Sequence, residues 1–220
     1  MTALDLFGHP FSAYTWKVLI PLYENGTAFR FRRLGEDQPE NGAALAAHWP
    51  LAQFPLLLDD GRPVIESSVI IEHLDHRHPG PLRLIPADAD AAIEVRMLDR
   101  IFDNHVMNQM QRVVNDALRP PERRDPLEVA DAKARLERAY AWLESWMGSR
   151  EWAAAGAFTL ADCAAAPALF YADWVHPIAA EHARLRTYRT RLLARPSIAK
   201  CVDDARPYRP LFPLGAPDRD

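Results

Sequence analysis

Alternating and helical hydrophobic patterns follow one another along the first third of the chain. Residues 3–7 alternate and end at Gly8, which predicts a strand. From Ser12 to Glu24 the apolar side chains recur at helical spacing, and Asn25-Gly26 is typical of a helix end. Residues 28–32 alternate again and predict a second strand. This order of elements predicts a right-handed crossover and a parallel strand pair.

The segment from residue 53 to residue 74 combines an interrupted strand, a turn and a helix start. Pro55 lies within an extended apolar run, where a ring without an N–H is tolerated at a strand's start, at an edge or in a turn. The Phe54-Pro55 bond is therefore a candidate cis peptide. Residues 59–62 supply turn chemistry and predict a β-hairpin. Helical spacing follows, so we expect a helix from about residues 66–68, with a serine available to cap it.

Beyond His78-Pro79-Gly80-Pro81 almost every segment has helical spacing. Two long helices are predicted, over 88–118 and 126–147, and residues 158–162 predict a capped helix start. We therefore expect an α/β domain of the thioredoxin type over residues 1–78, a linker over 79–88 and an all-helical domain over 89–220.

Composition and charge exclude few function classes but disfavour several. The 26 basic and 30 acidic residues give a net charge of -4 without a basic cluster, so nucleic acid is not an expected partner. Neither a leader nor a membrane-spanning stretch is recognisable, which predicts a cytoplasmic protein without a membrane partner. The two cysteines, Cys163 and Cys201, are expected to be buried reduced thiols.

The histidines suggest no metal site at this stage. His73, His76 and His78 are the closest set, but they follow the expected end of a helix and are predicted to face solvent. No metal is therefore expected among the cofactors.

Three motifs, in this order and at this spacing, resemble the cytosolic glutathione S-transferase family over nearly the whole chain. Gln53-Phe54-Pro55 resembles the segment in which a residue before a cis-proline presents its backbone to the cysteinyl part of glutathione. Glu66-Ser67 resembles the pair that binds the γ-glutamyl end, and residues 158–169 resemble the capping-box helix of the second domain. The resemblance implies a thioredoxin-like βαβαββα domain followed by an all-α domain, with glutathione as a substrate.

The chemistry of the glutathione-binding residues agrees with this resemblance. Ser67 can donate to a carboxylate, Glu66 can accept from the amine, and charge-assisted hydrogen bonds are roughly twice as strong as neutral ones. The main chain at Phe54 can pair with the peptide like an added strand. The basic residue that meets the glycyl carboxylate is not identified, although His48 lies nearby in the sequence.

Three residues compete to activate the glutathione thiol. Ser12 lies where zeta- and theta-like members of the family carry their serine, and its hydroxyl would stabilise the thiolate beside a helix N-terminus. Alternatively, Ser12 only caps the helix. Tyr14 is the second candidate and His9 the third. No cysteine lies in this loop, which disfavours the mixed-disulfide chemistry of omega- and beta-like relatives.

The resemblance also places a small hydrophobic electrophile between the domains. Four residues at helical spacing are expected either to line this pocket or to form a dimer interface: Asn104, Met107, Asn108 and Gln111. Trp174, Tyr208 and Phe212 are candidates to close the site, with core packing as the alternative for Trp174.

The resulting functional hypothesis is a glutathione transferase, which joins the glutathione thiolate to a small electrophile. Two alternatives stay open. One is a glutathione-dependent isomerase or dehalogenase, disfavoured because residues 12–15 (SAYT) depart from the serine-serine-cysteine pattern of the isomerases. The other is a non-catalytic module that binds glutathione or a protein partner. The resemblance also implies a homodimer, formed by the third helix of one subunit and the long helix of the other.

Overall fold

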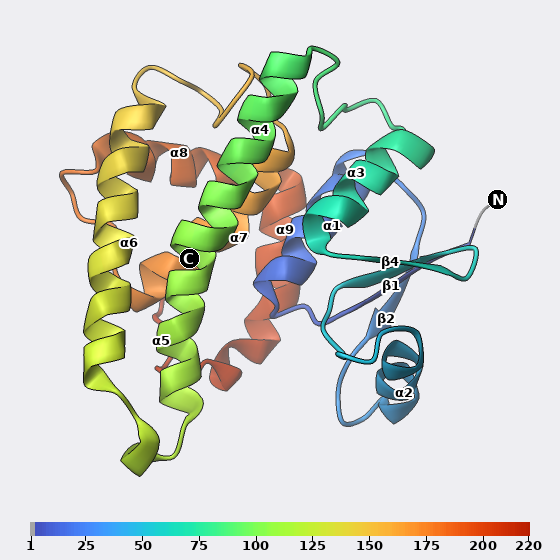
Figure 1. The fold of residues 1–220 in the computed structure, drawn as a ribbon, viewed down its shortest axis with the longest axis horizontal. Helices are drawn as coiled ribbons and strands as arrows, with labels where there is room; N and C mark the ends of the chain where they lie inside the picture. Colours follow the sequence, from blue (N-terminus) through green and yellow to red (C-terminus); the bar gives the residue numbers. More distant parts are fainter. Residues whose placement is uncertain (1–2) are drawn as a thin grey trace.

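Four strands form one mixed sheet at one side of the molecule (Figure 1). The structure is a computed structural model and describes residues 3–220. The strand order is β2-β1-β3-β4, with β1 and β2 parallel and β3 antiparallel to both of its neighbours. The predicted parallel strand pair and hairpin are thus confirmed. The strands are β1 (Leu4–Gly8), β2 (Arg30–Arg33), β3 (Leu56–Asp59) and β4 (Arg62–Ile65).

Helices cover both faces of this sheet. Alternate side chains of a strand point to opposite faces, so Leu57 packs in the main core with α1 (Ala13–Glu24) and α3 (Ser67–Arg77). Its neighbours Leu56 and Leu58 pack instead against Leu45 of α2 (Pro39–His48). Figure 1 shows α2 on the other side of the sheet from α1 and α3. The N-terminal domain is therefore a three-layer thioredoxin-like unit.

The second domain is helical and is arranged around α7 (Leu160–Val175), which is buried along its whole length. The predicted capping box is present at its start, between Thr159 and Asp162. None of the helices in residues 3–220 is long and apolar enough to cross a membrane. The other elements are α4 (Ala89–Ile101), η1 (Phe102–Met107), α5 (Asn108–Leu118), η2 (Pro121–Arg123), α6 (Pro126–Met147), α8 (Ala183–Leu193), α9 (Pro196–Ala205) and η3 (Arg206–Leu211).

The single long helix predicted over 88–118 contains a π-helical stretch. The elements α4, η1 and α5 follow one another without a loop, and η1 is the π-helical part. Such stretches shift the helix register and are frequent at functional sites. Here the stretch lies between α4 and α5, and its Asp103 contacts Lys17 of the N-terminal domain.

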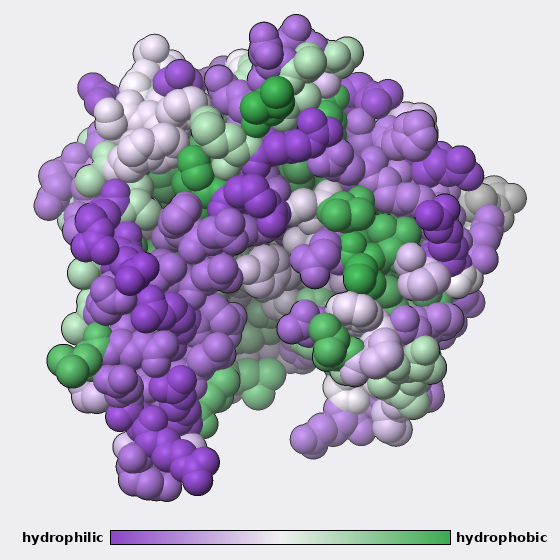
Figure 2. Space-filling model, in the orientation of Figure 1, coloured by the Kyte–Doolittle hydropathy of each residue, from purple (hydrophilic) through white to green (hydrophobic). Residues whose placement is uncertain are grey.

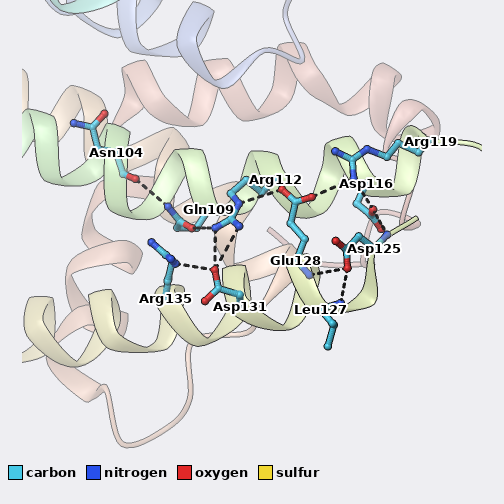
Figure 3. Close-up of polar contacts among 10 residues, drawn as sticks. All are labelled: Asn104, Gln109, Arg112, Asp116, Arg119, Asp125, Leu127, Glu128, Asp131 and Arg135. Atoms are coloured by element: carbon cyan, nitrogen blue, oxygen red, sulfur yellow. Dashed lines mark hydrogen bonds and ion pairs between the residues drawn. The ribbon is translucent and has the colours of Figure 1, made fainter. Parts of the chain in front are cut away.

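Ion pairs join α5 to α6 along one face of this long helix (Figure 3). Arg112 bonds the carboxylate of Asp131 at 3.3 Å, and Arg119 contacts Glu128 at 3.1 Å. The Asn104 side chain points away from this network in Figure 3. The long helix therefore has one polar face that is paired with α6 and a second that is not.

Candidate functional site

A cavity of about 710 Å³ lies between the two domains. Its walls come from the start of α1, the segment before β3, the start of α3 and one face of the α4–η1–α5 helix. Figure 2 shows the molecule hollowed between the helical half and the α2 region. The first two candidates for thiol activation and the five residues proposed to bind glutathione all line it: Ser12, Tyr14, Gln53, Phe54, Pro55, Glu66 and Ser67. The third candidate for thiol activation, His9, does not.

The segment before β3 presents the predicted cis bond to the cavity. The Phe54-Pro55 peptide is cis, which confirms the expectation from the sequence. Strand pairing begins only at Leu56, so the main chain at Gln53 and Phe54 precedes the ladder. Both side chains are exposed, whereas Pro55 is buried. The main chain of this segment is thus a free edge beside the cavity.

The start of α3 differs from the predicted serine cap. Glu66 is the N-cap residue, with φ 68° and ψ 118°, and no side chain of the described residues caps this helix. A non-glycine residue in this backbone region costs about 1–3 kcal/mol and is typical of functional sites. Ser67, buried at the first helical position, lines the cavity. The first-turn N–H groups are left for a ligand or solvent.

Ser12 both caps α1 and lines the cavity. Its Oγ accepts a hydrogen bond from the Thr15 N–H at 3.3 Å. A hydroxyl accepts through its lone pairs and keeps its own O–H for a second partner. The two alternatives for Ser12 are therefore geometrically compatible, and its role toward a thiol stays a prediction.

Hydrogen bonds from both domains fix the loop that carries Ser12. The Trp16 indole N–H donates to the Pro10 carbonyl at 2.5 Å, within the N-terminal domain. From α7 of the helical domain, the Tyr171 hydroxyl donates to the Phe11 carbonyl at 3.0 Å. The position of Ser12 thus depends on the docking of the two domains.

Tyr14 bridges the cavity walls. Its hydroxyl donates to Asn108 Oδ1 at 3.2 Å. Burial and the nearby Asp103 carboxylate raise the pKa of Tyr14 far above its ordinary value, so the phenol stays protonated at neutral pH. The residue is a hydrogen-bond donor here, and that donor is already engaged by the helical domain.

The helical wall of the cavity is made of polar side chains. Asn104, Asn108 and Gln111 line it as predicted from their spacing. Met107 does not, because it is 1% exposed and packs in the core. It lies one position before Asn108, about 100° around the helix, which turns it away from the cavity. Three further residues of the long helix complete the wall: Arg100, Asp103 and Asn115.

His9, the third candidate for thiol activation, lies outside the cavity lining. Its ring packs edge-on against Tyr208 at 4.6 Å between centroids, and its Nδ1 accepts from the Phe11 N–H at 3.1 Å. Burial, together with the charge of Arg33, lowers the pKa of His9. The ring is thus a neutral packing element of the loop.

The aromatic residues expected to close the site also lie elsewhere. Trp174 and Phe212 are buried against each other, with centroids 5.2 Å apart. Tyr208 faces His9 instead of the cavity. For Trp174 the structure selects the core-packing alternative. His48 is exposed at the end of α2 and is not part of the lining either.

A buried ion cluster behind the cavity was missed from the sequence. Lys17 of α1 is 1% exposed, and its ammonium contacts Asp99 at 2.5 Å and Asp103 at 2.7 Å. It also donates to Ser68 Oγ at 2.9 Å. Burial raises the pKa of Asp103, although the Lys17 charge opposes this. The sequence contained two signals of this cluster. Lys17 interrupts the apolar stripe of a helix, and Asp99 and Asp103 lie four positions apart on another helix.

Arg100 brings this cluster to the cavity surface. Its guanidinium contacts Asp103 at 2.6 Å, and its side chain is half exposed. Among the described residues that line the cavity it is the one basic side chain. The cavity thus combines an acceptor (Glu66), hydroxyl donors (Ser12, Ser67), a helix N-terminus and a cation. This set suits a ligand that carries an ammonium and carboxylates.

Comparison with known proteins gives matches over both domains. "Glutathione S-transferase, N-terminal domain" matches residues 6–82, and "Glutathione S-transferase, C-terminal domain" matches residues 106–196. The structure of a glutathione transferase family member from Pseudomonas fluorescens Pf-5, with bound glutathione, is 31% identical with a TM-score of 0.77. It covers 90% of this chain and 98% of that one.

Two curated proteins are also similar. A stringent starvation protein A homolog from Coxiella burnetii is 27% identical over 76% of this chain and 75% of its own length. A probable glutathione S-transferase from Nicotiana tabacum is 27% identical over 57% of this chain. The match spans 53% of the tobacco protein, about half its length.

Proposed function

Since the chain belongs to the glutathione S-transferase family, we propose that it binds glutathione in its N-terminal domain and transfers the thiolate to an electrophile in the interdomain cavity. One observation carries this proposal. The cis Phe54-Pro55 segment, the strained Glu66 and the uncapped start of α3 come from different parts of the N-terminal domain and meet at one cavity.

The glutathione peptide is held by complementary charges and main-chain bonds. In this proposal the main chain at Phe54 pairs with the cysteinyl part, and the Glu66 carboxylate accepts from the γ-glutamyl amine. Ser67 donates to the adjacent carboxylate through its hydroxyl and N–H. Arg100 adds a positive charge at the same end of the cavity, beside Ser68. This assigns a cation to the γ-glutamyl end, and none to the glycyl carboxylate.

Ser12 is the proposed activator of the thiol, which makes the chain a serine-type member similar to the zeta and theta classes. While its Oγ accepts from Thr15, its O–H donates to the sulfur and stabilises the thiolate. The positive end of α1 acts in the same direction. Tyr14 is the weaker candidate because its hydroxyl already donates to Asn108.

The cavity lining supports a polar electrophile instead of the hydrophobic one expected from the resemblance. Every residue that the long helix contributes is polar, and four are carboxamides that offer both donors and acceptors: Asn104, Asn108, Gln111 and Asn115. Trp49 and Phe54 provide an apolar surface across the cavity. An electrophile with a flat apolar body and hydrogen-bonding substituents fits both walls.

Exposed apolar side chains on α3 and α4 support the proposed homodimer. Val69 is 54%, Ile93 63% and Met97 41% exposed. An ion pair between Arg96 and Glu72, at 2.8 Å, links the two helices on this side. Light scattering tests the assembly: we expect twice the 24.9 kDa chain mass, and a monomeric mass contradicts it.

A non-catalytic role is the second candidate, favoured by the similarity to the stringent starvation protein A homolog. In that case the N-terminal domain binds glutathione or nothing, and the exposed helices bind a protein partner. Calorimetric titration with glutathione tests binding, and turnover of an aryl halide then separates an enzyme from a module that only binds glutathione. Absence of both heat and thermal stabilisation favours the partner-binding role.

Turnover of an aryl halide by three Ser12 forms tests the catalytic role. We expect Ser12→Ala to lower kcat by about tenfold or more, because one donor to the developing charge is lost. Ser12→Thr keeps both the helix cap and a hydroxyl, so it should retain most of the rate. Glutathione binding should change little in either variant. Equal turnover in all three forms removes Ser12 from the mechanism.

A further inference from the structure

Three side chains meet at the end of the N-terminal domain that lies away from the cavity. Asp59 ends β3, His73 lies in α3 and His78 is the residue that ends α3. The Nε2 atoms of both imidazoles lie 2.7 Å from the same oxygen, Oδ2 of Asp59. The two rings are 16% exposed and the carboxylate 11%. The expectation that these histidines face solvent is therefore wrong for His73 and His78.

The backbone explains this convergence. His78 lies five positions after His73, which by helical spacing alone places it on another face. Its backbone is no longer helical, with φ -130° and ψ 53°, so its side chain does not follow the helical spacing. His76, by contrast, stays in the helix and is exposed, as predicted. A residue within the helix, its C-cap and a strand-end residue thus meet at one point.

The donor atoms are close to the arrangement that a metal ion needs. A tetrahedral zinc ion with bonds of about 2.0–2.2 Å holds its ligand atoms roughly 3.4 Å apart. The three donor atoms here all lie within 4.8 Å of one another. The two nitrogen–oxygen separations, now 2.7 Å, need to widen by less than roughly 1 Å to reach this spacing.

We propose that Asp59, His73 and His78 bind a divalent transition-metal ion of the zinc class, with water completing the coordination. Two imidazole nitrogens and one carboxylate oxygen suit zinc, cobalt, nickel or copper, whereas magnesium and calcium prefer oxygen ligands throughout. Within residues 3–220 this is the one group of three or more histidine, cysteine, aspartate or glutamate side chains whose donor atoms lie this close together.

Proton positions are consistent with such a site. An ionised carboxylate only accepts, so each imidazole donates an Nε2–H to Asp59 in this geometry. Metal binding moves that proton to Nδ1 and turns the Nε2 lone pair toward the ion.

The position of the site indicates a structural role. Helix α3 has 11 residues and is about 16 Å long, with Ser67 of the cavity at its start, His73 in its second half and His78 as its C-cap. An ion there would cross-link the hairpin to α3 without touching the cavity. It stabilises the folded state to the extent that it binds folded protein more tightly than unfolded protein.

Zinc chloride titrated into the full chain, followed by calorimetry and thermal unfolding, tests the proposal. We expect one ion per chain and a higher Tm in zinc, reversed by a chelator. His73→Gln and His78→Gln should each weaken binding at least tenfold, because a ligand is lost while an amide can still donate to Asp59. His76→Gln, on the exposed face of the same helix, is the matched control and should bind as the wild type does.

Cobalt(II) offers a second readout that does not depend on the variants. Its visible absorption should show a tetrahedral or five-coordinate site with nitrogen ligands on the wild-type chain, and zinc should displace it. The proposal is overturned by absence of binding in the wild type, or by binding that the His73 and His78 variants leave unchanged. Because the cavity is not involved, either result is independent of glutathione binding.

Discussion

The N-terminal wall of the cavity presents main-chain groups, whereas the helical wall presents side-chain amides. On the first wall the cis Phe54-Pro55 bond and the positive φ of Glu66 expose backbone atoms and a helix start. On the second, Asn104, Asn108 and Gln111 extend from one face of the long helix. Backbone geometry is independent of most substitutions, so the first wall suits a ligand common to many reactions. The second wall changes with each side chain, which suits a variable substrate.

The polar side chains on the two faces of the same long helix have different hydrogen-bond partners. On the α6 side Arg112 and Arg119 are paired with acids of the neighbouring helix, as Figure 3 shows. On the cavity side Asn108 contacts Tyr14, and Gln111 bonds only Asn115 of its own helix among the described residues. The paired face holds the domain together. The cavity face keeps hydrogen-bonding capacity for a ligand.

The largest expected effect comes from the ion cluster that joins the two walls. Lys17→Met removes the buried cation and leaves the Asp99 and Asp103 carboxylates with only the half-exposed Arg100 guanidinium, which should cost about 3 kcal/mol of unfolding free energy. Urea denaturation measures this loss. Adding Asp99→Asn and Asp103→Asn to the same chain should recover most of it, because no buried charge then lacks a partner. A loss below 1 kcal/mol in Lys17→Met contradicts the burial of the cluster.

A change on the N-terminal wall should weaken glutathione binding while sparing the fold. Ser67→Ala removes a hydroxyl donor to a carboxylate, a bond of about 1.5–3 kcal/mol, so Kd should rise about tenfold to a hundredfold. Calorimetry measures the change. His76→Gln on the exposed face of α3 is the control and should leave Kd unaltered. If Ser67→Ala also binds normally, α3 does not hold the γ-glutamyl end.

A change on the helical wall should instead alter the choice of electrophile. Gln111→Leu replaces an amide by an apolar side chain of similar size at the cavity. The ratio of kcat/KM for an apolar over a polar electrophile should rise by about tenfold, equivalent to roughly 1.4 kcal/mol. The KM for glutathione should stay constant. A change confined to glutathione would reverse the roles assigned to the two walls.

The smallest expected effect is the response of the N-terminal domain to acid. Hydrogen bonds from Arg30 and Arg32 lower the pKa of Asp5 on β1, although burial opposes them. A carboxyl group with a lowered pKa in the folded state stabilises the fold at pH values above its unfolded-state pKa of about 4. This contribution is lost as the pH falls through the folded-state pKa. Asp5→Asn should therefore be less stable than the wild type at pH 6, and the difference should disappear as the pH falls through the lowered pKa of Asp5. Because Arg30 is largely exposed, the difference should be small.

Denaturation curves at several pH values measure this difference. Asp37→Asn, at an exposed carboxylate paired with Arg33, is a suitable control and should change stability less. A difference for Asp5→Asn that grows toward acid has the wrong sign for a lowered pKa.

Features that depend on residues adjacent in the sequence were predicted correctly. The hairpin, the cis bond before Leu56 and the capping box at Thr159 depend on local turn and cap chemistry, and all three are present. The helix start near Glu66 was also predicted, but not its cap. A serine offers good capping chemistry, yet the chain enters the helix through Glu66 with positive φ, a conformation that side-chain chemistry alone does not indicate.

Features that depend on the relative positions of elements were missed or misplaced. Met107 was assigned to the cavity from helical spacing, although the register places it in the core beside Asn108. Lys17 meets Asp103, 86 positions later, only because α1 docks on the helical domain. His78 meets Asp59 because its backbone leaves the helical conformation at the end of α3. In each case the deciding contact is set by packing between elements.

Short-range patterns in the amino-acid sequence thus established the thioredoxin-like and helical halves. They also established the motifs of the N-terminal wall, which suggested membership of the glutathione S-transferase family. Periodicity, turns and caps act over a few residues, so they can be recognised without coordinates. The cavity, its polar helical wall, the ion cluster at Lys17 and the meeting of Asp59 with two histidines required the folded chain. These depend on which faces of separate helices and strands pack together, and that choice follows from burial and charge pairing across the whole molecule.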